Sequence, residues 1–497
     1  MTIRHIFIIA AAAVSTFGVS CNKVLVEDPQ SIISPDAFFK TEAQCVQATN
    51  GVYSHLPDIF AQSAFWSMCM AGTDLFLYHG GSTATTAIQD YDFSAASETN
   101  SYALWKSVYP AVKDANFVIS RLQSAPIADS AKNRLLGECK FLRAMDYYML
   151  TNTFGDVPLW TGELDAAKVA ELPRSPVADV RAQMISDLKD AAAGLPLSYD
   201  AQDVGRVTKG AALTLLAKTY LFAKDWQNAY QTAGEVISGH QYQLLSHFSD
   251  LFDPTLKNKN NRESVFEIQY NRDASTNLNY QTSQYYSWFF PQGDASGGTY
   301  AGVDFGTTLL QSYPEFYPTH RLVNLYQDAD TRKDVTLAWG YNGQPFTAFP
   351  EPGYPWFGPK FWDLTANRTN SAKNLYFLRY ADVLMTYAEA ANELGKTADA
   401  IGALNQIEER AGLDDLDASM SQAALRQFIM DERAREFVGE FQRKWDLARW
   451  GKLVDDLQLI AGENPKGAKN VKAFNALFPI PYDEISKNPK LTQNQGY

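Results

Sequence analysis

Two pairs of alanines, each pair twelve residues apart, constrain the fold of this chain more than any other feature. Ala217 and Ala229 form the first pair, and Ala388 and Ala400 form the second. Each pair stands in a segment whose apolar residues recur with helical periodicity, and Gly395 marks a turn inside the second segment. Small residues at such positions let two helices approach closely. The spacing therefore predicts two helical hairpins.

The predicted hairpins are repeat units of the tetratricopeptide kind. They cover about 207–239 and 378–412, and a weaker third unit covers about 133–159. A loop-rich insert of about 240–377 contains the strand-like run 264–270 and many Gly, Pro, Asn and aromatic residues. The sequence therefore predicts a mostly α fold, in which a helical scaffold carries one large insert of loops and short strands. Function concentrates on loops held by such a scaffold.

The N-terminus has the pattern of an export signal. Residues 1–20 begin with basic Arg4, continue with the apolar run 6–14 and end in small residues. Cys21 follows the small residues of 18–20, as in a bacterial lipobox, so we expect a lipoprotein signal peptide over 1–20 and lipid attachment at Cys21. The alternative is an ordinary cysteine beside a conventional cleavage site. No later run approaches the roughly 20 apolar residues that a membrane-spanning helix needs.

Composition argues against several classes of function. The formal net charge is −13, and an acidic chain without a basic run does not fit a nucleic-acid-binding protein. Cys45, Cys69 and Cys139 form no C-x-x-C pair and are odd in number, which favours buried free thiols over disulfides or a zinc site. With 46% hydrophobic residues and no Gly/Ser linker, residues 21–497 are expected to form a single domain.

Five ordered blocks along the chain form a recognisable pattern. They are Cys21 through Tyr53, Gly137 through Leu159, Leu378 through Ala390, Glu432 through Gly451, and Pro479-Ile480-Pro481 through Gly496-Tyr497. Together they resemble the SusD/RagB outer-membrane lipoproteins of Bacteroidetes, and the resemblance runs nearly from end to end. We expect the last block to be an ordered part of the fold.

The resemblance implies properties that composition and periodicity do not. It implies a SusD-like fold of tetratricopeptide-like hairpins, an outer-membrane location with a lipid anchor and exposure at the cell surface, and a SusC-like TonB-dependent transporter as partner. It implies that the chain captures oligosaccharide, or peptide in RagB-like relatives, and delivers it to the transporter. This role requires no enzymatic activity and no cofactor.

The segment 421–450 is highly charged and is expected to be one charged helix. Its carboxylates and guanidiniums stand three and four residues apart and share a helical face. A glycosidase would need a carboxylic acid of raised pKa, whereas abundant arginine lowers the pKa of nearby carboxylates. We therefore predict a structural ion-pair network and no catalytic residues. The run 328–334 begins like a calcium loop but lacks its central Gly and terminal Glu, so we predict no metal site.

Aromatic residues gather in three predicted loop regions, around 66–93, at 285–290 and at 339–362. Aromatic faces stack on the apolar faces of pyranose rings, and polar side chains bond to the hydroxyls. The resemblance places the ligand platform on loops in these regions. The alternative is that any one ring packs beneath the loops as core. The residues that we predict to bind ligand are Tyr78, Tyr91, Asn100, Tyr285, Tyr286, Trp288, Trp339 and Trp356.

The expected function is capture of oligosaccharide or polysaccharide at the cell surface and its delivery to a SusC-like transporter. Within the same fold, the alternative is capture of oligopeptides, as in RagB-like proteins. A glycosidase and a scaffold that binds only protein are two further alternatives. The sequence names neither the sugar nor its linkage.

Overall fold

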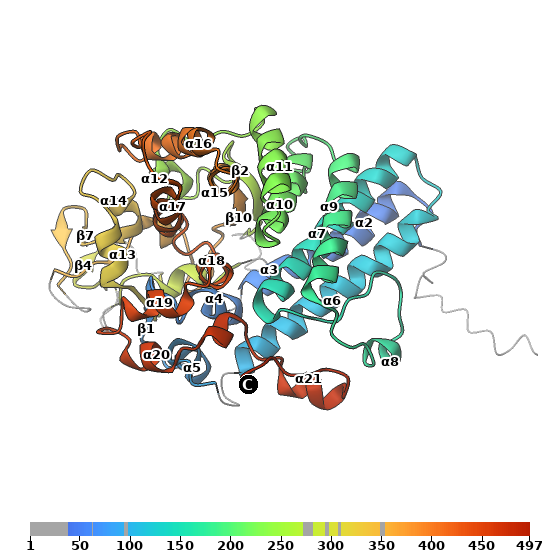
Figure 1. The fold of residues 1–497 in the computed structure, drawn as a ribbon, viewed down its shortest axis with the longest axis horizontal. Coiled ribbons are helices and arrows are strands. Elements are labelled where there is room, and N and C mark those ends of the chain that lie inside the picture. The colour runs from blue at the N-terminus through green and yellow to red at the C-terminus, as the bar shows by residue number, and fades with distance from the viewer. Residues whose placement is uncertain are drawn as a thin grey trace, which may run out of the picture.

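The structure is a computed structural model that describes residues 38–61, 63–93, 98–271, 282–293, 298–306, 310–347 and 353–497. The predicted signal peptide over 1–20 and the predicted lipid-attachment residue Cys21 lie outside these ranges. Helix makes up 53% of the structure, and the strands are few and short (Figure 1). The predicted mostly α fold class is confirmed.

The first half of the chain folds almost entirely into helices. Its elements are α2 (Glu42–Tyr53), α3 (His55–Ala61), α4 (Ser63–Met70), β1 (Phe76–Tyr78), α5 (Thr83–Asp90), α6 (Glu98–Gln123), α7 (Asp129–Phe154), α8 (Ala166–Val169), α9 (Val177–Gly194), α10 (Lys209–Phe222) and α11 (Trp226–Ser238). Several begin at a side chain that accepts a free N–H of the first turn: Thr41 for α2, Thr208 for α10 and Asp225 for α11.

The long helices pack in one continuous stack. α6 packs on α7, α7 on α9, α9 on α10 and α10 on α11. The next member is α15 (Tyr380–Glu393), which packs on α11 and forms a hairpin with α16 (Thr397–Arg410). Gly395 turns this hairpin with a φ of +73°, and the four alanines that predicted the hairpins are all buried. Hairpins that the insert separates in sequence are therefore neighbours in space (Figure 1).

The insert between α11 and α15 is built of short elements. They are α12 (Phe248–Leu251), β2 (Ser264–Ile268), the 3₁₀ helix η1 (Tyr285–Trp288), β3 (Thr299–Tyr300), β4 (Val303–Asp304), β5 (Phe316–Pro318), α13 (His320–Leu325), α14 (Lys333–Thr336), β6 (Leu337–Ala338), β7 (Gly340–Tyr341), β8 (Gln344–Pro345), β9 (Trp356–Phe357), the 3₁₀ helix η2 (Pro359–Phe361) and β10 (Leu375–Arg379).

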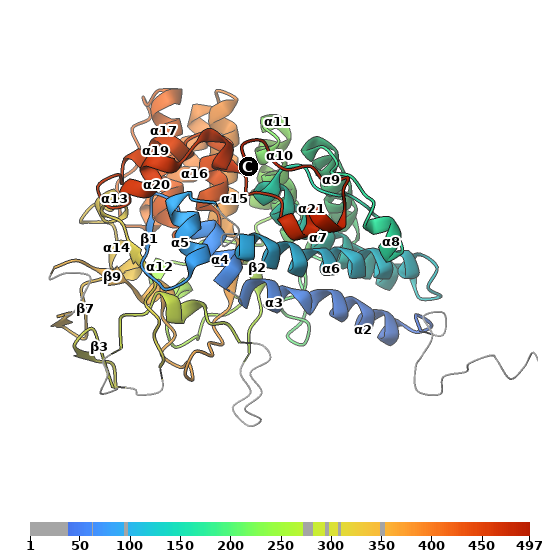
Figure 2. The ribbon, with the colours of Figure 1, turned by 90° about the horizontal axis from the view of Figure 1, so that it is seen from below.

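The strands of the described residues pair two by two and antiparallel, as β1–β5, β2–β10, β3–β4, β6–β9 and β7–β8. The pair β1–β5 joins the insert to the N-terminal part of the chain, and Figure 2 shows the insert gathered at the end of the molecule opposite α8.

The C-terminal part corrects one prediction. Its elements are α17 (Gln422–Glu436), α18 (Arg443–Trp450), α19 (Leu453–Gln458), α20 (Pro465–Asn470), the 3₁₀ helix η3 (Ala473–Ala476) and α21 (Tyr482–Lys487). The expectation of one charged helix over 421–450 is wrong, because the chain turns between α17 and α18, where Gly439 and Phe441 have φ of +78° and +62°. The last block is ordered, as predicted: the Asn494 amide donates to the Phe154 carbonyl at 2.9 Å.

Buried ion pairs join the insert to the C-terminal helices, and they confirm the predicted structural network. The fully buried Arg332 of the insert pairs with Asp330 and with Glu436 of α17, both at 2.8 Å. Arg379 of β10 pairs with Glu440 at 2.7 Å and also with Glu436. Burial alone would raise the pKa of Glu436, but the arginines around it hold that pKa well below its ordinary value. This is the reverse of the raised pKa that a glycosidase acid needs.

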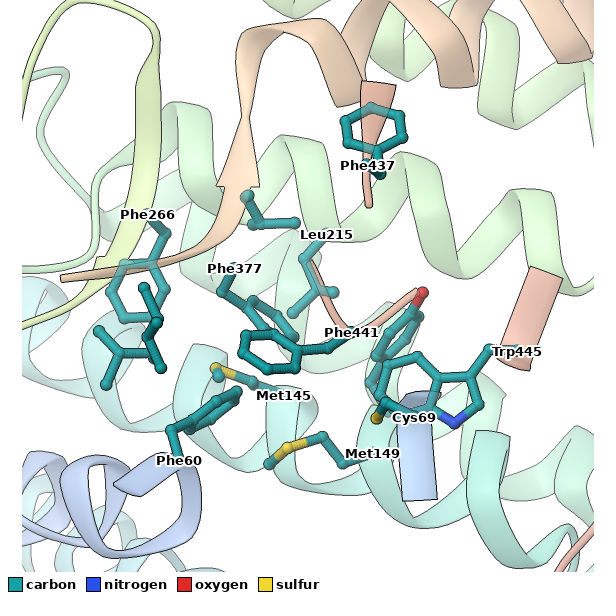
Figure 3. Close-up of a cluster of buried hydrophobic side chains, with 14 of the residues drawn as sticks. Phe60, Cys69, Met145, Met149, Leu215, Phe266, Phe377, Phe437, Phe441 and Trp445 are labelled. Carbon is teal, nitrogen blue, oxygen red and sulfur yellow. The ribbon is translucent and has the colours of Figure 1, made fainter. Parts of the chain in front are cut away.

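The main apolar core of the described residues includes side chains of both the helical stack and the insert. Figure 3 shows Phe60 of α3, Met145 of α7 and Leu215 of α10 close to Phe377 of β10 and to Phe441. The Phe60 ring centroid lies 5.8 Å from that of Phe377 and 5.7 Å from that of Phe441. The three cysteines predicted to be buried free thiols are free and buried. Across the described residues, no helix combines the length and the apolar character required to cross a bilayer.

Candidate functional site

The segment that leads into β1 is fixed by a buried carboxylate. Asp74 is fully buried, and its oxygens accept hydrogen bonds from Arg443 at 2.7 and 2.6 Å and from Arg321 at 2.6 Å. Burial alone would raise the pKa of Asp74, but the two guanidiniums outweigh burial and the pKa lies below its ordinary value. Because Arg321 belongs to α13 and Arg443 to α18, this carboxylate holds three distant parts of the chain together.

Strand β1 ends in a tight turn that is braced by the insert. The Tyr78 hydroxyl donates to Glu315 Oε2 at 2.8 Å and accepts from the Ser82 N–H at 2.9 Å. A Cβ at Gly80 would lie 2.3 Å from Glu315 Oε2 and 2.4 Å from the Tyr78 hydroxyl. Only glycine fits this close approach without displacing the two side chains.

The 3₁₀ helix η1 lies beside this turn. Two N–H groups of the segment 313–315 donate to carbonyls of η1, at 2.7 and 3.0 Å. The Trp288 ring packs edge-on against Trp66 at a centroid distance of 5.8 Å and lies 6.1 Å from the Phe316 ring. Trp66 and Phe316 are buried, whereas Trp288 is part-exposed and Tyr313 is 44% exposed. Exposed rings therefore stand on a rigid aromatic base.

We call the surface formed by His79, Trp288, Tyr313 and Glu315 the aromatic rim. His79 is exposed, and its ring packs edge-on against a buried tyrosine of β5 at 5.1 Å. Partial desolvation by neighbouring residues raises the pKa of Glu315 and lowers the pKa of His79, so both shifts favour the uncharged forms. The rim thus combines two accessible aromatic rings with two polar side chains. Rings of this kind stack on the apolar face of a sugar, and the polar groups bond to its hydroxyls.

The structure brings three of the eight predicted binding residues together. Tyr78, Tyr285 and Trp288 gather around the buried base of the rim, where the Tyr285 and Trp66 ring centroids are 5.1 Å apart. Tyr78 is 3% exposed and Tyr285 is 7% exposed, so of the three only Trp288 offers an accessible surface. Trp356, on strand β9, is 0% exposed. Its ring packs against a tyrosine of β5.

The other four predicted residues lie apart from this group. Tyr91 is buried beneath Lys444, whose Nζ lies 4.3 Å from the Tyr91 ring centroid. Asn100 is buried and donates to a threonine of α5 at 3.4 Å. Tyr286 is buried, and its hydroxyl donates to a backbone carbonyl of the insert. Trp339 is part-exposed, and a lysine of α14 lies 5.8 Å from its ring centroid.

Sequence reasoning missed His79, Tyr313 and Glu315. Glu315 and its partner Tyr78 are 237 residues apart, so no rule of local spacing pairs them. Tyr313 stands outside the aromatic clusters that the sequence singles out. The available signal was the glycine turn at Gly80 between aromatic residues, which indicates a close backbone approach but not the partner.

Comparison with known proteins gives matches along most of the chain. A family model described as the SusD family matches residues 353–497, and a model described as starch-binding associating with outer membrane matches residues 32–221. The SusD-like protein P25 of Formosa agariphila is 26% identical over an alignment of 546 residues that covers 100% of both chains.

Solved structures match both the helical stack and the insert. A SusD superfamily protein from Bacteroides vulgatus is 25% identical with a TM-score of 0.78, covering 93% of this chain and 100% of that chain. A laminarin-binding SusD-like protein is 24% identical with a TM-score of 0.77, covering 92% of this chain and 100% of that chain. From its helical stack to its C-terminal block, the chain belongs to the SusD/RagB family.

Proposed function

We propose that this chain binds oligosaccharide at the aromatic rim and delivers it to a SusC-like TonB-dependent outer-membrane transporter. The observation that carries the proposal is the pair of accessible rings, Trp288 and Tyr313, on a base that hydrogen bonds and buried aromatic packing hold in place. A preformed platform binds a flexible glycan with less loss of conformational freedom than a mobile loop does.

Two findings on related proteins support a glycan as the ligand. One family model that matches this chain is described as starch-binding, and one similar structure is that of a laminarin-binding protein. Both glycans are neutral polymers of glucose, whose hydroxyl groups can hydrogen-bond to a carboxyl and an imidazole group such as those of the rim.

Within this proposal the predicted residues divide by exposure. Trp288 contacts the sugar directly, and Trp339 is a second stacking ring at the part-exposed edge of the insert. Tyr78, Tyr285 and Trp356 are buried and support the platform from beneath. Tyr91, Asn100 and Tyr286 are buried away from the rim, so the proposal gives them no contact with the sugar. Tyr313, Glu315 and His79 complete the contact surface.

We further propose that the protein is anchored to the outer membrane by a lipid and does not act as an enzyme. A signal peptide over 1–20 precedes a single domain over 21–497, and a lipid on Cys21 holds the chain at the outer membrane with the rim exposed at the cell surface. Replacement of Cys21 by Ala is expected to move the protein from the membrane fraction to the soluble fraction. Incubation with a bound polysaccharide is expected to release no new reducing ends.

Native gel electrophoresis through starch or laminarin tests the proposed site. Trp288→Ala and Tyr313→Ala are each expected to weaken retardation about fivefold or more, since loss of one stacked ring removes about 1–3 kcal/mol. Tyr482→Ala is the matched control, because this 65% exposed tyrosine lies on α21, away from the rim. Unchanged retardation of both rim variants would refute the rim as the site. Binding of a peptide pool, with no glycan retarding the wild type, would favour the oligopeptide alternative.

A further inference from the structure

A groove lies where the end of α2 and the start of α3 meet strand β2 and the segment 198–208. Two hollows of about 290 and 340 Å³ form it. The hollows share five lining residues, which belong to the segment 204–206 and to β2, so they are two halves of one groove. No residue of the aromatic rim lines either hollow, and Figure 1 draws β1 and β2 in different parts of the fold, so the groove is separate from the rim.

The segment that crosses the groove is held rigidly. The Arg206 guanidinium donates to Asp203 at 2.6 Å, to the buried Glu138 at 2.8 Å and to the Asn50 side chain at 2.8 Å. The Arg206 carbon Cζ lies 5.8 Å from the ring centroid of Tyr53. The Tyr53 hydroxyl accepts a hydrogen bond from the backbone N–H of Val207 at 3.0 Å. The groove is therefore formed before any ligand arrives, which reduces the entropy lost on binding.

A glycine allows a close approach between two walls of the groove. Gly205 has a φ of +96°, and a Cβ there would lie 2.8 Å from the side chain of Gln269. Next to it, Val204 lines both hollows and is 55% exposed. The crossing segment thus presents an accessible apolar side chain to both hollows, whose lining is mixed polar and apolar.

Amide and tyrosine side chains dominate the polar lining. The amides are Asn50, Gln202, Gln241, Asn260, Asn261 and Gln269. Some of these groups are already bonded inside the protein: Asn260 and Gln269 bond to each other at 3.0 and 2.7 Å, and the Asn50 oxygen accepts from Arg206. The remaining amide donors and acceptors match hydroxyl groups, which also donate and accept. Tyr53 and Tyr199 line the same groove and are both part-exposed. Hydroxyl-bearing rings with apolar C–H faces fit such a lining.

The charges of the groove cancel. Its charged lining residues are Asp203, Arg206, Arg262 and Glu267, two acidic and two basic. Arg206 is already paired with Asp203, and Glu267 is buried and accepts the Asn260 N–H at 3.0 Å. A ligand with fixed charges, such as a peptide with free termini, would find little net countercharge here. The lining therefore favours an uncharged ligand.

We propose that this groove is a second glycan-binding site, which takes a neutral oligosaccharide independently of the aromatic rim. One long glycan, or two neighbouring chains of a polysaccharide, would then be held at two separate places. Two weak sites on one protein raise the overall affinity for a polymer without any new contact at either site.

Native gels containing starch or laminarin test the second site with the full chain. Val204→Glu places a charge in both halves of the groove, and Leu197→Glu is the control, since this 64% exposed leucine lies seven residues earlier and lines neither hollow. Both substitutions change exposed side chains and are expected to leave folding intact. Each is combined with the wild-type rim and with Trp288→Ala/Tyr313→Ala.

The expected result is that Val204→Glu weakens retardation about fivefold or more in both backgrounds, whereas Leu197→Glu has no effect. If Val204→Glu reduces retardation while the rim variant behaves as wild type, the groove is supported and the rim is refuted. Equal migration of Val204→Glu and Leu197→Glu in both backgrounds overturns the second site. Loss of binding to a peptide pool, rather than to the glycans, in Val204→Glu also overturns it.

Discussion

Replacing Lys444 by Met is expected to stabilise the protein, although it removes a hydrogen bond. Lys444 is 1% exposed, and its Nζ donates to the Tyr91 hydroxyl and lies over the Tyr91 ring. Burial lowers the pKa of Lys444 to about 7 from the model-peptide value of 10.5. At about 1.4 kcal/mol per pKa unit, the buried ammonium costs about 4 kcal/mol at pH 7.

Methionine has a similar length and no charge, so the substitution removes this cost. The lost hydrogen bond and cation–π contact offset about 1–2 kcal/mol of the gain. Tyr91 keeps a partner, because its hydroxyl donates to the Gly72 carbonyl. The net gain expected at pH 7 is about 2–3 kcal/mol.

The pH dependence of the gain identifies its cause. Between about pH 7 and pH 10 the unfolded lysine holds its proton and the folded lysine does not, so the unfolded state binds more protons. The stability of the wild type therefore rises with pH across this window, while Lys444→Met lacks this contribution. The advantage of the variant is expected to shrink by about 2 kcal/mol between pH 7 and pH 9.

Urea unfolding followed by tryptophan fluorescence at pH 7 and pH 9 measures both effects. Lys360→Met is the matched control, because Lys360 is equally buried but pairs with Glu440 at 2.7 Å. Loss of the Lys360 ammonium leaves the Glu440 carboxylate with one partner fewer, so Lys360→Met is expected to destabilise the protein. The reasoning would be refuted if Lys444→Met were less stable than wild type at pH 7. It would also be refuted if the variant's gain in free energy of unfolding were the same at pH 7 and pH 9.

Three further predictions test the rim, the ion-pair network and the thiols. Gly80→Ala, whose Cβ would meet Glu315 at 2.3 Å, should lose about 1–3 kcal/mol of stability and most glycan retardation, while Gly81→Ala, with no atom within 4 Å, should do neither. Arg332→Met leaves buried carboxylates uncompensated and should cost about 3–5 kcal/mol by urea unfolding. Cys139, whose pKa burial raises to about 12, should react with a thiol reagent only after denaturation.

The helical part of the fold was predictable from sequence because its signals are local. The pairs of alanines twelve residues apart and the glycine at the hairpin turn report contacts between helices that are adjacent in the chain. The packing of α11 on α15 was not predictable, because a long insert separates them and nothing in either helix names the other. The same holds for β1 and β5, which are short strands from distant parts of the chain.

The candidate site was only partly predictable. Aromatic composition pointed to regions that contain parts of the proposed rim, and Trp288 is both in the predicted set and accessible. Exposure decides which rings are able to touch a ligand, and exposure depends on tertiary packing rather than on residue type. Trp356 and Trp288 are alike in sequence terms, yet one is 0% exposed and the other forms the rim.

The high aromatic content has a structural cause that is separate from ligand binding. Among the residues of the insert that the structure describes, the strands are two to five residues long and pair only two by two, so their hydrogen bonds contribute little to holding the insert together. Aromatic rings supply large buried areas with few rotatable bonds: Phe290 packs against Tyr300 and Phe305 at 5.1 Å and against Trp362 at 5.6 Å. A loop-rich insert of this kind needs such rings as its core whether or not it binds a sugar. Abundance of aromatic residues is therefore weak evidence for a glycan platform, and the strong evidence is an accessible ring on a braced support, as at Trp288.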